Sequence, residues 1–255
     1  YSLMAEVRAE APRLIRSQEV VIPVDQPILQ GQYDALSKMS SVDVTYNKLG
    51  LLYRLEGPTG IVFSDAFRRL QLGEAAPEAL EKLGTILLAT GTETFVVRRN
   101  DVPEPYRRIV LEQSIRGIPV LGGLSDIDVD ERSGMLRDLH SRFIPDRGLP
   151  TGPKLTSQEA YERTVEYLEG AGWAEPKSVQ LQGDPTLAYL AGIHELQRPR
   201  LIWVVIVEYL KPIEGSDERY AWIDAIDGSC QGLSPVGAAA LPATVRTANG
   251  TSRRP

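Results

Sequence analysis

The chain has 255 residues, 42% of them hydrophobic and 24% charged, with a formal net charge of −6. These values are typical of a globular protein with one large or two modest domains, and they argue against wholesale disorder. No stretch concentrates Lys and Arg among aromatic residues, which argues against a nucleic-acid partner. No apolar run reaches the roughly 18 residues that a membrane span requires.

The region 1–145 is predicted to hold helices followed by a small sheet. Residues 64–72 and 77–83 carry apolar side chains at helical spacing, and Pro77 stands at a first helical position, where its missing N–H costs nothing. Four alternating or β-branched runs then predict strands at Thr94–Arg99, Arg108–Ile115, Leu124–Asp130 and Met135–Phe143. The ERSG sequence at 131–134 predicts a hairpin between the last two.

Residues 146–154 are predicted to form a linker, because two glycines and two prolines suppress regular structure there. A helix at Ser157–Gly170 follows, with Thr156 and Glu159 as a capping box. Three strands are then expected at 186–193, 201–209 and 220–226, with a hairpin at Asp227–Gly228.

The predicted fold class is therefore α+β, with two small units that each pack helices on one face of an antiparallel sheet. The second unit spans residues 155–233. Residues 234–255 are rich in small side chains and are predicted to be a flexible tail.

Three stretches in this order resemble the prosegment of thermolysin-family metallopeptidases. Residues 110–123 (VLEQSIRGIPVLGG) are similar to the fungalysin/thermolysin propeptide motif. The helix Ser157–Gly170 lies where the family has its PepSY helix, and residues 200–204 and 220–228 are similar to the closing strands of that module. The resemblance implies a PepSY-like helix and meander in the second unit.

The resemblance also implies a function, since such prosegments assist folding of a zinc peptidase and block its cleft. We therefore expect a non-catalytic protein that binds a thermolysin-like metallopeptidase. The expected docking surfaces are the tail and the turn 117–123, both exposed. The residues assigned to partner binding by this resemblance are Gln113, Gly117, Ile118, Pro119, Val120 and Gly122.

The candidate metal and nucleophile patterns favour no catalytic site. His194–Glu195 begins like H-E-x-x-H, but Arg198 occupies the second histidine position. Asp126, Asp128 and Asp130 resemble a calcium loop without its later ligands, and on a strand they form a carboxylate row that could protect a sheet edge. We expect no metal, no cofactor and no catalytic residue, and read Cys230 as an incidental small residue.

Two alternatives remain open at this point. The chain could be an interaction module that reuses the scaffold for a peptide or a cell-surface partner, or a fragment of a longer peptidase precursor. A secreted or periplasmic location, with a signal peptide already removed, is expected; the single cysteine is compatible with it.

Overall fold

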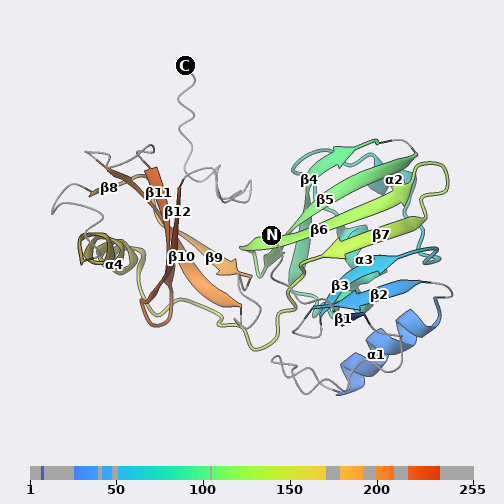
Figure 1. Cartoon of the computed structure of the whole chain (residues 1–255), viewed down its shortest axis with the longest axis horizontal. Coiled ribbons are helices and arrows are strands. Elements are labelled where there is room, and N and C mark those ends of the chain that lie inside the picture. Colours follow the sequence, from blue (N-terminus) through green and yellow to red (C-terminus); the bar gives the residue numbers. More distant parts are fainter. Residues whose placement is uncertain are drawn as a thin grey trace. The chain divides into compact units, whose positions relative to one another are not determined.

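The computed structural model describes residues 7–8, 26–39, 42–47, 51–103, 105–170, 179–191, 199–209 and 218–235. The fold is mixed α+β, as predicted, and it divides into two compact units (Figure 1). Unit 1 comprises Tyr1–Gly148 and Ala191–Pro199, and unit 2 comprises Leu149–Leu190 and Arg200–Pro255. The chain first passes from unit 1 to unit 2 between Gly148 and Leu149, within the segment 146–154 that was predicted to be a linker.

Unit 1 is built on an antiparallel sheet with the strand order β1-β2-β3-β7-β6-β5-β4. The strands are β1 (Val7–Arg8), β2 (Asp43–Tyr46), β3 (Leu52–Glu56), β4 (Glu93–Asp101), β5 (Tyr106–Ile115), β6 (Ile118–Asp130) and β7 (Leu136–Ser141). Because β6 pairs on both sides, its aspartate row lies in the middle of the sheet. The expectation that this row protects an edge is therefore wrong.

Helices cover one face of this sheet, and α3 is seen behind the strands in Figure 1. They are α1 (Gln26–Ser37), α2 (Asp65–Arg68) and α3 (Pro77–Leu87). Side chains alternate along β6, so Ile127 and Val129 are fully buried in the core beneath the helices, whereas Asp126 and Asp128 lie on the opposite, open face.

The helices of unit 1 differ from the predicted ones in three ways. Helix α3 continues to Leu87 and ends at Leu88, which has a left-handed conformation with φ 62°. Helix α2 is a single turn, since Arg69 already leaves the helical conformation. Helix α1 was not predicted; the buried Gln32 side chain ties it to α3 by donating a 2.7 Å hydrogen bond to the Ile86 carbonyl.

Unit 2 combines one helix with an antiparallel sheet centred on β10. The elements are α4 (Ser157–Gly170), β8 (Val179–Leu181), β9 (Thr186–Leu190), β10 (Arg200–Tyr209), β11 (Glu218–Asp224) and β12 (Cys230–Pro235). Both β8 and β9 pair with one side of β10, and β11 and β12 follow on its other side. Residues 234 and 235 belong to β12 rather than to a tail, and the predicted tail beyond them lies outside the described residues.

The start of α4 confirms the predicted capping box. The Glu159 N–H donates to the Thr156 hydroxyl over 3.2 Å, and the Glu159 carboxylate accepts from the Thr156 N–H over 2.7 Å. Two donors of the first helical turn are thereby satisfied reciprocally.

Both faces of the unit 2 sheet are apolar. Val205 and Ala221 face α4, and the neighbouring Val204 and Trp222 point the other way. Trp203 and Trp222 therefore lie on opposite faces of the sheet and are not cross-strand partners. Among the described helices, none is long and apolar enough to cross a membrane.

Candidate functional site

The six residues assigned to partner binding lie around the β5–β6 connection of unit 1. The structure places them at different depths: Gly117 and Gly122 are exposed, Ile118 is half-buried, and Gln113, Pro119 and Val120 are buried. The turn itself consists of Arg116 and Gly117 alone, because β6 begins at Ile118. The expectation that the segment 117–123 is one exposed turn is thus wrong.

The turn is tight and held on both sides. Arg116 and Gly117 both have positive φ, 51° and 77°, which is the backbone of a two-residue turn matched to strand twist. The Arg116 N–H donates to the Thr92 carbonyl over 2.9 Å, and its guanidinium pairs with the Asp146 carboxylate. The Thr92 hydroxyl also donates to Asp146, over 2.7 Å. These contacts fix the position of the turn.

Gln113 anchors the chain below this turn. Between the pairs Glu112↔Leu124 and Ser114↔Pro119, Gln113 alone lies opposite residues 120–123, so β6 bulges there. A Cβ on Gly123 would lie 2.6 Å from Val120 Cγ1 and 3.2 Å from Gln113 Oε1, so a glycine is needed at this position. The position of Gln113 is that of a structural residue, with 1% of its surface exposed.

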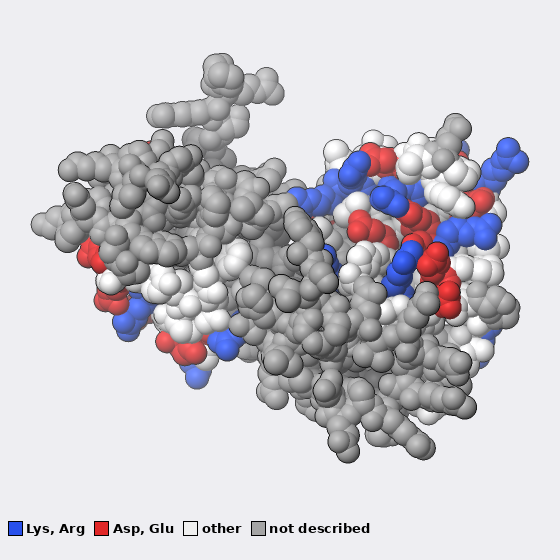
Figure 2. Space-filling view, viewed as in Figure 1, with Lys and Arg blue, Asp and Glu red and all other residues white. Residues whose placement is uncertain are grey.

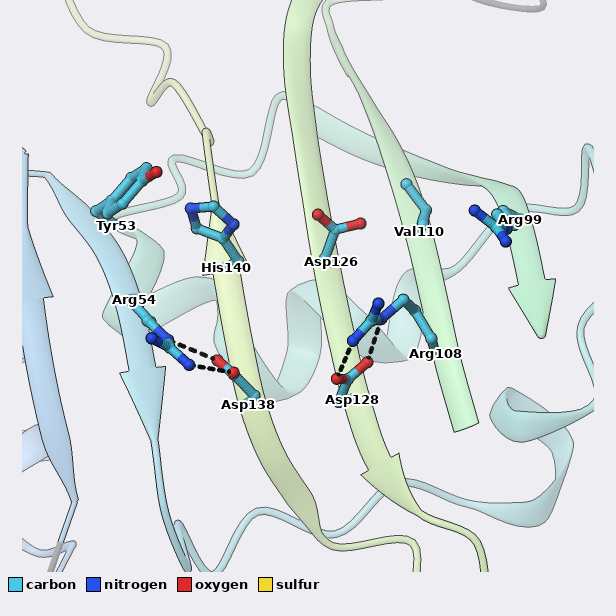
Figure 3. A pocket seen from close by; sticks show the side chains of 9 residues that line it. All are labelled: Tyr53, Arg54, Arg99, Arg108, Val110, Asp126, Asp128, Asp138 and His140. Atoms are coloured by element: carbon cyan, nitrogen blue, oxygen red, sulfur yellow. Dashed lines mark hydrogen bonds and ion pairs between the residues drawn. The ribbon is translucent and has the colours of Figure 1, made fainter. Parts of the chain in front are cut away.

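The open face of the unit 1 sheet carries a second feature, a hollow of about 340 Å³ (Figure 3). Its lining comes from β3, β7, β6, β5 and β4, and comprises Tyr53, Arg54, Arg99, Arg108, Val110, Asp126, Asp128, Asp138 and His140. Acidic and basic side chains are interspersed over this side of unit 1 in Figure 2. We refer to this feature as the charged hollow.

Two ion pairs bridge neighbouring strands of the charged hollow. Arg108 donates from Nε and Nη2 to the two carboxylate oxygens of Asp128, over 2.8 and 2.7 Å. Arg54 donates to Asp138 from Nη2 over 2.9 Å. The hydrogen bond to Asp128 raises the pKa of Arg108 further above its ordinary value, so this guanidinium stays ionised at any physiological pH.

Asp126 differs from the other two aspartates of the charged hollow. It lies opposite Val110 on β5 and His140 on β7. Its carboxylate forms no hydrogen bond or ion pair with the part of the chain that the structure describes, and no dashed line reaches it in Figure 3. Tyr53 packs edge-on against His140, with 4.3 Å between the ring centroids.

The patterns weighed for metal or nucleophile chemistry have other roles where the structure describes them. The Asp130 carboxylate accepts hydrogen bonds from the N–H groups of Arg132 and Ser133, so it stabilises the β6–β7 turn. Burial raises the pKa of the Cys230 thiol, which disfavours its nucleophilic thiolate form. Within the described ranges, no three His, Cys, Asp or Glu side chains gather as metal ligands, and His194 lies outside those ranges.

The charged hollow was not predicted as a site, although the aspartate row on its central strand was noted. Its members lie between residues 53 and 140, and only strand register brings them together. The sequence signal was the alternation of charged and apolar residues along the runs that became β5 and β6.

Comparison with solved structures finds distant likenesses. The chain is similar to the Bacillus megaterium YpeB C-terminal domain, with 10% sequence identity and a TM-score of 0.33, over 84% of this chain and 98% of that one. This likeness does not confirm the resemblance to thermolysin-family prosegments. No protein-family model and no curated protein matches the sequence.

Proposed function

We propose that this chain is a non-catalytic, prosegment-like protein that binds a thermolysin-like metallopeptidase and inhibits it or assists its folding. The observation that supports this is the build of the β5–β6 turn. Arg116 and Gly117 are exposed at its tip. The Thr92 carbonyl accepts a hydrogen bond from the Arg116 N–H, and the Gln113 side chain below donates one to the Ile144 carbonyl. A turn that is rigid before docking loses little conformational entropy on binding.

The proposal includes the absence of catalysis by the chain itself. Its support is the sequence, in which Arg198 takes the place of the second histidine of a zinc-peptidase motif. Elemental analysis and casein hydrolysis test this part. Stoichiometric zinc together with chelator-sensitive hydrolysis would contradict it.

The proposal also includes export, since a peptidase of this class acts outside the cytoplasm in the family that the sequence resembles. Fractionation of the source cells, with detection by an antibody against the chain, tests this location. Recovery confined to the cytoplasmic fraction would contradict it.

The binding proposal is tested with the full chain in large molar excess over thermolysin and over metallopeptidases from the protein's own source. We expect reversible inhibition or direct binding, weakened by Ile118→Asp. Val120→Asp is unsuitable, because Val120 is 1% exposed and a carboxylate there would disrupt the fold. Leu72→Asp is the matched control, since Leu72 is 69% exposed and lies outside the turn.

Wild-type protein that neither binds nor inhibits any of these peptidases would overturn the proposed partner. A second candidate function, an interaction module that binds another protein, would then take its place. The charged hollow favours this candidate, because it offers a polar surface that does not depend on the β5–β6 turn.

A further inference from the structure

We propose that the charged hollow receives a basic side chain, arginine or lysine, from a protein partner. This inference rests on the proposed binding function, but it concerns a different surface from the turn and holds for any protein partner. The side chain would enter over β6, with its charged end at Asp126 and its aliphatic stem between Val110 and the His140 ring (Figure 3).

The charges around the charged hollow favour a cation. Arg54 is shared by Asp138, at 2.9 Å, and Glu56, at 3.1 Å. The remaining guanidinium groups also have carboxylate partners, Arg108 with Asp128 and Arg99 with Asp101.

Three aspartates and three arginines line the charged hollow, and Asp126 is the one of these aspartates without an ion-pair partner among the described residues, because Arg99 pairs with Asp101, which lies outside the lining. An incoming ammonium or guanidinium group would give Asp126 an ion-pair partner.

The walls of the charged hollow suit a long basic side chain better than a bare metal ion. Val110 and the edge-packed rings of Tyr53 and His140 offer apolar surface, which the methylene stem of Lys or Arg can cover while its charged end stays hydrated. A guanidinium group can also stack against an aromatic ring. A divalent cation would require several oxygen or nitrogen ligands, and no such group of three is present among the described residues.

Two arginines of the charged hollow are already paired with aspartates of its lining, which leaves Asp126 for such a side chain. Arg108 is held by two hydrogen bonds to Asp128, and Arg54 by its bond to Asp138. Neither guanidinium therefore has to leave a partner to compensate Asp126, and binding requires no exchange of these pairs.

The test is an NMR titration of the full chain with three probes, the N-acetyl, N′-methylamide derivatives of arginine, lysine and glutamate. We expect the Val110 methyl and Asp126 amide signals to shift with the two basic probes and not with the glutamate probe. Asp126→Asn has the same shape without the charge, and should weaken binding of the arginine probe by about three- to fivefold, the range of a partly exposed ion pair.

Glu81→Gln is the matched control, since Glu81 is an exposed carboxylate on α3, which packs on the other side of the sheet. It removes the same charge and should leave binding unchanged. An unshifted Val110 signal with both basic probes, equal binding by Asp126→Asn, or the same shifts with the glutamate probe would each overturn the inference.

Zinc chloride and calcium chloride, added alone, form the remaining arm of this titration. Saturable shifts of the same signals by either metal at lower concentration than the arginine probe would mean a metal site and overturn the inference. None of these measurements involves a peptidase, so failure here and failure of the proposed partner are distinguishable.

Discussion

Gln113 and Ile144 are 31 residues apart in the chain and are joined by two hydrogen bonds, one in each direction. The Gln113 amide nitrogen donates to the Ile144 carbonyl over 2.6 Å, and the Ile144 N–H donates to Gln113 Oε1 over 3.0 Å. The Gln113 side chain thus makes the hydrogen bonds that a neighbouring strand would otherwise make to the backbone that follows β7. This pins the end of unit 1 to the strand below the β5–β6 turn.

Replacing Gln113 by leucine should therefore destabilise the protein. The variant leaves a buried N–H and a buried carbonyl without partners, which costs about 2–4 kcal/mol for the two groups together. Urea unfolding followed by circular dichroism measures the change. The control is Gln158→Leu, where the exposed side chain bonds Glu162 and the loss should stay below about 0.5 kcal/mol. Equal midpoints for the two variants would contradict a structural role for Gln113.

Gly134 is expected to be intolerant of a side chain. It has φ 71°, and an added Cβ would overlap the Phe63 carbonyl oxygen. Gly134→Ala should cost more than about 2 kcal/mol, because the backbone at Gly134 or at Phe63 would have to move to relieve the overlap. Gly148→Ala is the control: its φ is 64° with open space around it, so it should cost only the conformational term of about 1 kcal/mol. Equal losses for both variants would rule out the overlap as the cause.

Glu159 makes the stability of unit 2 depend on pH. Hydrogen bonds from the Thr156 backbone N–H and then from its hydroxyl hold the pKa of Glu159 below its ordinary value of 4.5. A lowered folded-state pKa stabilises the protein above the unfolded pKa, and this contribution disappears as pH falls through the folded one. The melting temperature of wild type should exceed that of Glu159→Gln at pH 7, and the gap should close below about pH 4. A gap that is the same at pH 7 and pH 3 would contradict this assignment.

The sequence predictions were accurate where an element is stabilised by residues close to it in the chain. The bounds of α4 were predicted because Thr156 and Glu159 stabilise the helix start within four residues. The β6–β7 hairpin was likewise encoded at 131–134. In contrast, β8 and α1 are short or weakly patterned, and each is stabilised by a partner far along the chain, β8 by β10 and Gln32 of α1 by Ile86.

The segment 117–123 was wrongly predicted to be one turn because it is rich in glycine and proline. Gly117 is required for the turn, but Gly122 and Gly123 serve a bulge within β6, and Pro119 lies inside the strand. Glycine and proline mark backbone irregularity without saying whether the chain reverses there. The charged hollow could not be predicted from the sequence either, because the register that places His140 beside Asp126 depends on pairing across the whole sheet.

Val204 and Val205 provide the last prediction, because adjacent strand residues point to opposite faces. Val205 is 0% exposed and belongs to the core beneath α4, and Val204 is 1% exposed on the face that lacks this helix. Both Val205→Asp and Val204→Asp should destabilise by about 3 kcal/mol or more, since each places a carboxylate at a position that is almost fully buried. If the face of the sheet opposite α4 were exposed to solvent, only Val205→Asp would destabilise the protein. Urea unfolding of the two variants decides between these cases: a Val204→Asp protein as stable as wild type would mean that the second face is open to water.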